Sequence, residues 1–455
     1  MVSVQRKHTD TECSYSVLFS NTKKGNHVMN MFEMHSIISY PVNRMNRDDV
    51  GSPKSALFGG VERARVSSQA RKRADRKGMK EIHPEIFGGY RTKLFLSILI
   101  EMLKTEGVAE QHAPELAVKL AEMVFSKKNG GDGGEDGKSD GDDEKSEDTV
   151  PDNAVKEATS GGSETSTVTS KETETDKELT FKVAVYTSPR EIRGLAMLGA
   201  KKYKDAAEKT AKNGLNDEME SKAKKGKKNN KPSFVSTVVS SISKAELRTI
   251  YNLAEDAADI ALFGRMITSS NKDHFQVEGA AMYAHALSVH EAKSEIDYYV
   301  AVDDLSPTSA VYMMDHVEFN SACYYQYVAV NIDMLFDRRH LGSMPVESRR
   351  KVIDAYVRAF IMSVPGGAKN CMFAGCRPSF IRAVFRRGQP QQMTNAFEEP
   401  IRSKNGYITA AIKRFSDYYD EDCRAMCYRP DHIDFPNADI NTFCAAIVDK
   451  TVGKV

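Results

Sequence analysis

The most informative stretch of this chain is residues 65–77, which read RVSSQARKRADRK. Ser67 and Ser68 are suitable N-caps for a helix, because a serine side chain can accept a hydrogen bond from a free backbone N–H of the first turn. Gly78 is a suitable stop for that helix. We therefore predict a short helix over residues 69–77.

This predicted helix carries faces of different character. Ala70 and Ala74 are four residues apart, so their face could pack closely against a sheet, whereas Lys72 and Arg76 share a neighbouring face. Free N–H groups at a helix start hold a phosphate favourably. Such a helix would bind the nucleic-acid backbone, independently of base sequence and with strong salt dependence. A solvated basic helix has the same spacing, so both readings stay open.

Charge is segregated along the chain, although the formal net charge is only +1. Residues 61–77 hold seven basic side chains against two acidic ones, whereas residues 132–148 hold nine acidic against two basic. A nearly neutral protein with such blocks can still carry a local anion-binding surface.

The sequence has the features of a cytoplasmic protein. It contains no run of about 18 apolar residues, as a membrane span requires, and its first 26 residues have no apolar region typical of a signal peptide. The seven cysteines are odd in number and scattered, which favours reduced thiols over a disulfide framework.

Periodicity predicts a mixed α+β protein. Alternating apolar residues indicate strands over 28–38, 63–66, 298–302 and 319–332, and residues 372–385 are also rather strand-like. Three- and four-residue spacing predicts helices over 92–104, 109–125, 243–263, 346–364 and 407–419, with a further helical segment over 279–290. Ser243 and Glu246 have the spacing of a capping box.

Two segments interrupt this pattern. Residues 127–180 consist largely of Gly, Ser, Thr, Asp and Glu, and cannot bury enough apolar surface to offset the entropy of ordering. Residues 201–231 contain eleven lysines against five acidic residues. We predict both as disordered insertions, the second mobile or partly helical.

Candidate catalytic groups are few. The pair Asp48-Asp49 could hold a metal in a nuclease, but such carboxylates more often hydrogen-bond a turn or pair with a neighbour such as Arg47. Cys423 and Cys427 lack the second cysteine pair that completes a zinc site, and no glycine-rich stretch matches a P-loop. We predict no enzymatic activity, no metal and no cofactor.

Several motifs together resemble one protein family. They occur in this order: Asn46-Arg47-Asp48-Asp49, Lys54, Phe58-Gly59-Gly60, Arg65-Val66-Ser67-Ser68-Gln69 with Lys72-Arg73, Asp259-Ile260-Ala261-Leu262-Phe263-Gly264-Arg265-Met266, Val277-Glu278-Gly279-Ala280, Asp297-Tyr298-Tyr299-Val300 and Asn395-Ala396-Phe397-Glu398. Across about residues 30–420 the chain resembles the CasC family, the repeated crRNA-binding backbone subunit of the type I-E CRISPR Cascade complex.

The resemblance implies a hand-shaped protein. Its palm, an RRM-like (ferredoxin-like) sheet with helices, would comprise residues 28–77, 243–289 and 326–455. Its fingers would be a helical insertion over 78–242 that contains the two low-complexity segments, and its thumb a β-hairpin over 290–325. Residues 1–27 would form a mobile extension.

The resemblance also implies a function without catalysis. Copies would self-associate as a filament along crRNA and present its bases to target DNA, beside a large subunit, a small subunit, a 5′-handle-binding subunit and a crRNA-processing endonuclease, with no membrane partner. The implied RNA contacts, in which Met266 and Tyr299 are wedges beside a displaced base, are Arg47, Lys54, Ser67, Gln69, Lys72, Arg73, Arg76, Arg265, Met266 and Tyr299.

Two alternatives remain beside this reading. An RNA endonuclease, like the backbone subunits of type III complexes, would use Asp48 or Asp49. A stand-alone RNA-binding regulator would share the basic helix but would be a monomer with a short footprint on RNA.

Overall fold

The computed structural model describes residues 29–125, 168–169, 180–181, 184–217, 233–266, 275–302, 305 and 311–453. The chain divides into two compact units. The first unit is formed by Met1–His83, Ala280–Asp337 and Pro345–Val455, and the second by Pro84–Gly279 and Arg338–Met344. The predicted N-terminal extension over residues 1–27 lies outside the described residues.

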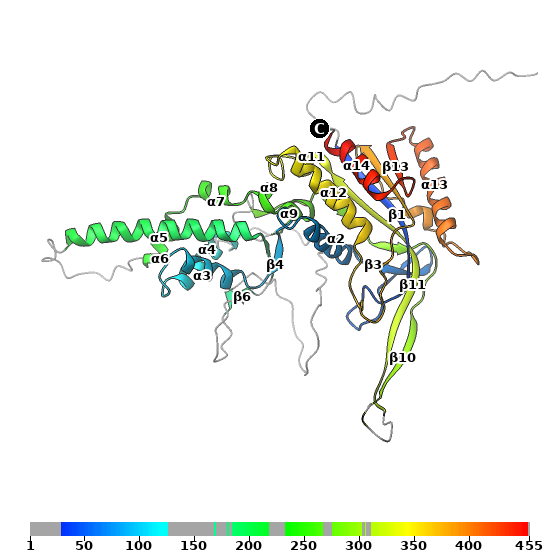
Figure 1. Cartoon of the computed structure of the whole chain (residues 1–455), viewed down its shortest axis with the longest axis horizontal. Helices are drawn as coiled ribbons and strands as arrows, with labels where there is room; N and C mark the ends of the chain where they lie inside the picture. Colours follow the sequence, from blue (N-terminus) through cyan, green and yellow to red (C-terminus); the bar gives the residue numbers. More distant parts are fainter. Residues whose placement is uncertain are drawn as a thin grey trace, which may run out of the picture. The chain divides into compact units, whose positions relative to one another are not determined.

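A nine-stranded antiparallel sheet is the centre of the first unit (Figure 1). Its main path runs in the order β13 (Asp431–Phe435), β12 (Phe380–Arg387), β1 (Asn30–Asn43), β11 (Val311–Asn331), β9 (Ala286–Ser288), β3 (Val61–Val66) and β2 (Ser55–Phe58). Two further strands, β8 (Ala281–Tyr283) and β10 (Glu295–Val302), pair with β11. The fold is therefore mixed α+β, as predicted.

Strand β1 is buried on both faces because helices cover both sides of the sheet. On one face, α13 (Ile408–Ala425) packs Phe415 and Tyr419 into a cluster with Met31 and Ile37 of β1. On the other face lies Phe32, whose ring stacks on Phe385 of β12 at 5.7 Å. That face is covered by α2 (Ser68–Ile82), α12 (Val346–Met362) and α14 (Ile440–Val452).

Helix α2 is longer than the helix predicted from sequence, since Gly78 does not end it. A Cβ on Gly78 would collide with Ser363 Oγ and lie 3.3 Å from Ala359 Cβ. The glycine instead allows α2 to approach the C-terminal end of α12 closely. The buried face of α2 carries Arg71, Asp75 and Met79, rather than the predicted pair of alanines.

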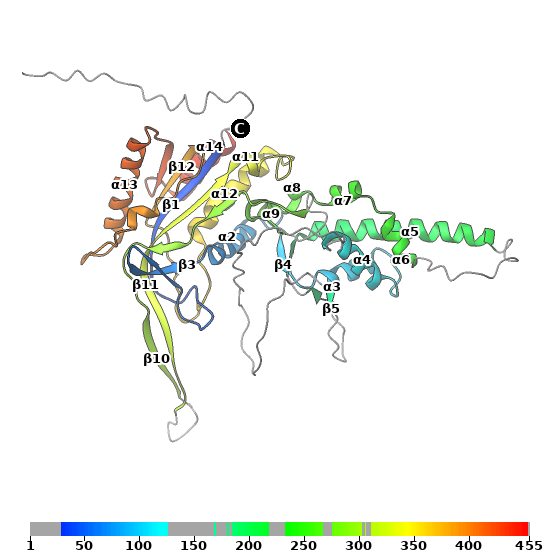
Figure 2. The same ribbon diagram turned by 180° about the vertical axis from the view of Figure 1, so that it is seen from behind.

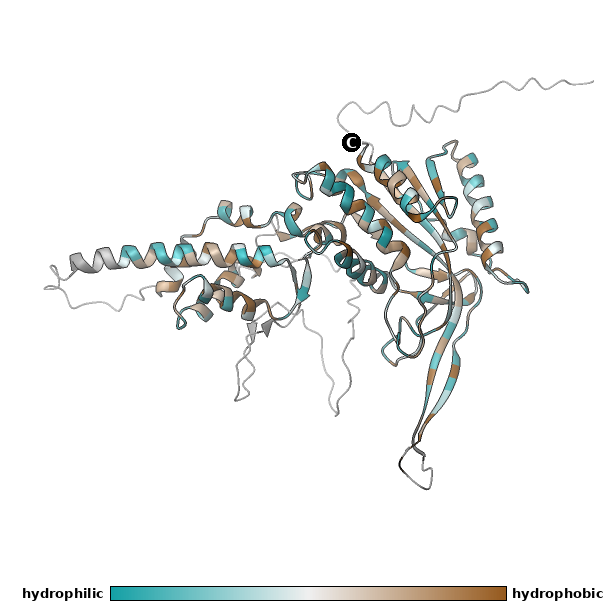
Figure 3. Ribbon diagram, viewed as in Figure 1, coloured by the Kyte–Doolittle hydropathy of each residue, from teal (hydrophilic) through white to brown (hydrophobic). Residues whose placement is uncertain are grey.

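Strands β10 and β11 form an antiparallel hairpin that extends away from the sheet (Figure 1, Figure 2). The two predicted strands are confirmed here, although β11 begins earlier than predicted, at Val311. Almost every described residue of β10 is exposed. Apolar and polar residues are mixed along the hairpin (Figure 3).

The second unit is a helical body. Its core contains Phe95, Leu96, Leu99 and Leu103 of α3 (Phe95–Thr105) at the predicted helical spacing. Buried residues of four more helices complete this core: α4 (Ala113–Phe125), α5 (Pro189–Asp217), α6 (Phe234–Ser240) and α7 (Lys244–Ile250). Four small strands form two short pairs: β4 (Tyr90–Thr92) pairs with β7 (Val185–Thr187), and β5 (Val168–Thr169) pairs with β6 (Thr180–Phe181).

Several sequence predictions differ from the structure. Residues 201–217 are helical as part of α5, in agreement with the partly helical alternative for residues 201–231, and Ala200, Tyr203 and Ala206 continue the apolar face of α5 onto the helical core. Residues 218–231, and residues 127–180 apart from 168, 169 and 180, lie outside the described residues. The single helix predicted over 243–263 is three: α7, α8 (Leu253–Asp256) and α9 (Ala258–Phe263). Asn252 starts a new helix by capping Ala254 N–H. The capping box of Ser243 and Glu246 is confirmed.

Residues 279–290 are not helical but contain β8 and β9, because both segments pair with β11. The division of the chain also differs from the predicted palm boundary. Leu247 of α7 belongs to the helical core of the second unit, and residues up to Gly279 cluster there. Strand β13 and helix α14 were not predicted. None of the described helices is both long and apolar enough to cross a membrane.

Candidate nucleic-acid interface

The loop after β1 is a rigid turn built around Asp48. The Asp48 carboxylate accepts hydrogen bonds from the backbone N–H groups of Val50 (3.1 Å) and Ser52 (2.8 Å). From the other side, the Arg44 guanidinium donates to the Gly51 carbonyl oxygen at 2.6 and 2.8 Å. Asp48 therefore holds a turn, which is the structural role that the sequence left open for it.

Asn46 joins this loop to the start of α2. Its side-chain oxygen accepts a hydrogen bond from Ser67 N–H (2.7 Å), and its carbonyl oxygen accepts one from Lys54 N–H (3.0 Å). Ser67 in turn caps the helix, since its Oγ accepts from Ala70 N–H (3.3 Å). Lys54 and the N-terminus of α2 are thereby held side by side. Ser67 is only 4% exposed, so its main role in the structure is this cap.

Four of the predicted RNA contacts share one face of α2. Gln69 and Arg73 are exposed, and Lys72 and Arg76 are half-buried. Their spacing of three, four and seven residues places them in one row along the helix. The Lys72 ammonium lies 5.6 Å from the centre of the Tyr283 ring, which holds it near the sheet. Arg47 is exposed on the neighbouring loop.

A neighbouring face of α2 is fixed by a buried ion pair that the sequence did not reveal. Arg71 Nη2 lies 3.1 Å from Asp75 Oδ1, and Tyr283 Oη donates to Asp75 Oδ2 at 2.9 Å. Arg71 also donates to the carbonyl oxygens of Ser363 (2.8 Å) and Phe360 at the end of α12. These bonds fix the position of the basic row above the sheet.

Two of the family motifs meet around Arg63, which is fully buried. Its guanidinium donates to the carbonyl oxygens of Phe58 (3.1 Å), Phe397 (2.9 Å) and Glu398 (3.1 Å). A Cβ on Gly59 would collide with the Glu398 carbonyl oxygen. The two motifs Phe58-Gly59-Gly60 and Asn395-Ala396-Phe397-Glu398 thus meet through the Arg63 side chain, and the close approach accounts for the glycine at position 59.

The β10–β11 hairpin has two unlike faces. Residues directly opposite each other in the register share a face, so Tyr298 and Val300 lie with Met314, and Tyr299 lies with Asp297 and Asp315. Tyr298 is 59% exposed and Tyr299 is 38% exposed. Tyr299 Oη donates a hydrogen bond to Asp315 Oδ2 at 3.5 Å. The predicted wedge at Tyr299 therefore lies on the more acidic face of the hairpin.

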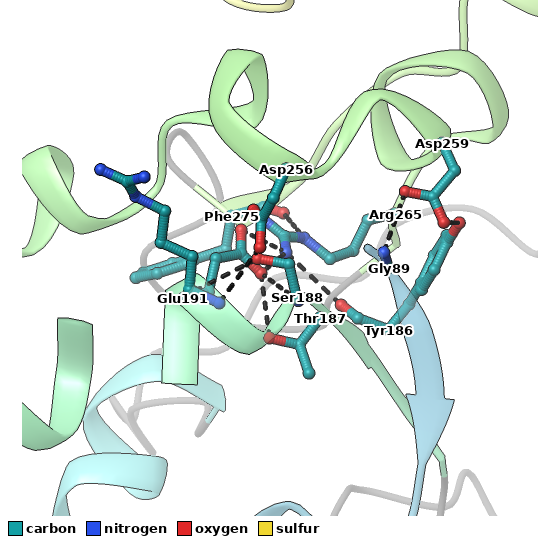
Figure 4. A network of polar contacts seen from close by, with 10 residues as sticks. Gly89, Tyr186, Thr187, Ser188, Glu191, Asp256, Asp259, Arg265 and Phe275 are labelled. Atoms are coloured by element: carbon teal, nitrogen blue, oxygen red, sulfur yellow. Dashed lines mark hydrogen bonds and ion pairs between the residues drawn. The ribbon is translucent and has the colours of Figure 1, made fainter. Parts of the chain in front are cut away.

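In the second unit, Met266 and Arg265 have opposite environments. Met266 is 84% exposed, as a wedge requires. Arg265 is buried, with its Nη1 2.7 Å from Glu191 Oε2 and its Nε 2.9 Å from the Phe275 carbonyl oxygen (Figure 4). The predicted RNA contact at Arg265 needs correction, because its guanidinium faces the interior and stabilises the turn that carries Met266.

That turn is also fixed by its backbone. Arg265 and Val277 exchange two backbone hydrogen bonds (2.8 and 2.9 Å). Gly264 adopts a φ of +80°, and a Cβ there would lie 2.9 Å from Gly279 N. Only glycine fits this close approach at positive φ. Gly264 and Gly279 of the two motifs thus allow their backbone segments to approach closely next to Arg265 and Met266.

Among the described residues, no group of three or more His, Cys, Asp or Glu side chains could hold a metal ion. Cys423 is buried and Cys427 is exposed. Burial raises the pKa of the Cys423 thiol, which makes it a poor thiolate ligand.

Comparisons with known proteins place this geometry in a family. No curated protein matches the chain. Two solved structures share its fold: one titled "CRISPR RNA-guided surveillance complex, pre-nicking" (TM-score 0.64, 23% identity, 92% of this chain and 100% of the other) and one titled "CRISPR RNA-guided surveillance complex" (TM-score 0.56, 21% identity, 92% and 99%). The sequence model of the CT1975-like proteins matches residues 32–435. The chain therefore belongs to the CT1975-like protein family, the CasC family of Cascade backbone subunits.

Proposed function

We propose that this chain is a non-catalytic backbone subunit that self-associates along crRNA in a type I-E Cascade complex. It holds the RNA phosphates and leaves the bases free to pair with target DNA. The first unit serves as the palm with the β10–β11 hairpin as its thumb, and the helices of the second unit serve as the fingers. The large, small, 5′-handle-binding and crRNA-processing subunits complete the assembly.

The observation that carries this proposal is the row formed by Gln69, Lys72, Arg73 and Arg76 on α2. The row is close to Lys54 and to the loop of Arg47, and the buried Arg71–Asp75 pair fixes the helix that carries it. Arg, Lys and Gln side chains supply many of the phosphate contacts in protein–nucleic acid complexes. A protein that must accept any guide sequence requires such contacts, because base pairing and not the protein reads the sequence.

The absence of catalysis in this proposal is supported by Asp48. Its carboxylate is already engaged by two backbone N–H groups of its own turn. The endonuclease alternative, in which Asp48 or Asp49 acts, would require the Asp48 carboxylate in its first form to bind a metal ion or activate a water molecule. Metal-dependent cuts at regular spacing in a paired target, lost in Asp48→Ala, would overturn the non-catalytic assignment.

The test of RNA binding uses the double variant Lys72→Ala/Arg76→Ala. Each phosphate contact contributes about 0.7 to the slope of log affinity against log salt on single-stranded nucleic acid, so we expect this slope to fall by about 1.4. The loss of affinity should be equal for RNAs of different sequence. The control is Lys413→Ala/Arg414→Ala on α13, which removes the same charge from the helix on the other face of the sheet. An unchanged slope in the α2 variant, or an equal change in the control, would refute the assignment.

A further inference from the structure

The loop of residues 365–379 between α12 and β12 is fixed against the proposed RNA surface. Gly367 lies on the backbone of the loop after β1: a Cβ there would be 2.5 Å from the Met45 carbonyl oxygen and 2.9 Å from that of Arg44. Ala374 is buried in one apolar cluster with Met45, and Ala70 of α2 packs against that cluster. The loop thus lies against the backbone of the loop after β1 and shares an apolar cluster with the start of α2.

This loop presents Phe373, which at 74% exposure is the most exposed aromatic side chain among the described residues. The ring leans on Gly375, since a Cβ on that glycine would lie 2.7 Å from Phe373 Cε1. Glycine therefore leaves room for the ring to lie over the backbone. One side of the ring is supported by the loop, and the rest is open to solvent.

The charge around Phe373 is positive. Residues 365–379 include Lys369 and Arg377, both exposed, and contain no acidic residue. An aromatic ring flanked by cations is the combination with which proteins bind single-stranded nucleic acid: the ring stacks on a base and the cations neutralise the backbone. Apart from Phe373 itself, the exposed side chains of this loop are Lys369, Asn370, Cys371 and Arg377. The core of a protein interface is instead depleted of charged residues.

We propose that Phe373 is a stacking platform for an unpaired base of the bound RNA, with Lys369 and Arg377 beside the flanking phosphates. This inference rests on the proposed function, because it assigns a further contact to the same RNA. It adds a base contact to a surface whose other members contact the phosphate backbone, and stacking suits any base.

The test measures binding of the full chain to a short fluorescent single-stranded RNA and to the same RNA made abasic. Phe373→Ala should weaken binding of the normal RNA at least about fivefold, the lower end of what one base–aromatic stack contributes. The salt slope should not change, because no charge is removed. Phe373→Trp should retain the affinity of the parent chain. The matched control is Met426→Ala, which removes another exposed apolar side chain, at the C-terminal end of α13.

The abasic RNA isolates the stacking contact. The parent chain should prefer the normal RNA to the abasic one, and Phe373→Ala should lose this preference. If Phe373→Ala binds both RNAs as the parent does while Lys72→Ala/Arg76→Ala is weakened, the platform is refuted and the proposed function stands. If neither variant is weakened, the proposed function fails as well. Normal RNA affinity with lost self-association in Phe373→Ala would assign the ring to a second copy of the chain and also overturn the platform.

Discussion

The buried pair of Arg71 and Asp75 allows us to predict a large loss of folding stability on substitution. Replacing Arg71 by Met keeps the apolar volume but removes the charge that faces Asp75 at 3.1 Å. It also removes the donor to the Ser363 carbonyl oxygen. Breaking a buried pair by removing one partner costs about 3–5 kcal/mol. For a unit of this size that corresponds to a fall in Tm of about 6–20 °C.

The pH dependence provides a second check on the same variant. Burial raises the pKa of the Asp75 carboxyl, and the Arg71 charge opposes this rise. In Arg71→Met the pKa of Asp75 in the folded chain should therefore lie further above its unfolded value of about 3.9. A group whose pKa is raised in the folded chain contributes most to folding stability below its unfolded pKa, and this stability is lost as the pH rises. The loss of stability in Arg71→Met, relative to the parent chain, should thus be smaller at pH 4.5 than at pH 7.

Thermal unfolding followed by circular dichroism at both pH values measures this deficit. The control is Lys413→Met, which breaks the exposed pair with Asp417 at the same four-residue spacing and should cost less than about 1 kcal/mol. If Arg71→Met lowered the Tm by less than about 2 °C, or by the same amount at pH 4.5 and pH 7, the reasoning would be refuted.

Two further predictions concern other positions. Gly78→Ala should lower the Tm despite the higher helix propensity of alanine, because the added Cβ would collide with Ser363 Oγ, and such overpacking costs about 1–3 kcal/mol; a higher Tm would show that α2 and α12 can separate freely. Hydrogen bonds from Lys202 and Ser243 lower the pKa of Glu246 to about 2, so its contribution to stability is present above about pH 4.5 and is lost as pH falls toward 2. The Tm difference between the parent chain and Glu246→Gln should therefore shrink as pH falls from 5 to 3, and a difference independent of pH would contradict this assignment.

The sequence predicted those elements whose signal is local. The helix after Ser67, the capping box at Ser243, the helix over α12 and the two hairpin strands are all confirmed, because caps and apolar periodicity act within a few residues. Strands β8 and β9 have three residues each. Such short strands carry no usable period, and pairing with β11 decides their conformation.

The sequence could not separate surface charge from buried charge. Arg71 and Lys72 are adjacent in one basic run, yet Arg71 is buried and donates to a carbonyl oxygen at the end of α12, whereas Lys72 is half-buried and lies over the Tyr283 ring. The family resemblance implied an RNA contact at Arg265, but its guanidinium pairs with Glu191, which lies 74 residues away in the sequence. Partners brought together only by the fold decide which charges are buried, and no local pattern reports them.

The proposed role also changes how the loop of Asp48 is understood. A paired carboxylate in a nucleic-acid protein suggests metal chemistry, but Asp48 accepts hydrogen bonds from Val50 and Ser52. The same turn positions Asn46, which ties the loop to Ser67. The geometry of the loop therefore explains Asn46 and Asp48 of the motif, whereas Arg47 and Asp49 are exposed.

The most direct test of the central claim is to isolate the chain from cells that also express a CRISPR array and the neighbouring subunits, and to sequence the bound RNA. The account predicts repeat–spacer RNA of uniform length in a large complex with several copies of this chain. Random RNA fragments bound to a single copy would contradict it and would leave a generic RNA-binding protein with the same fold.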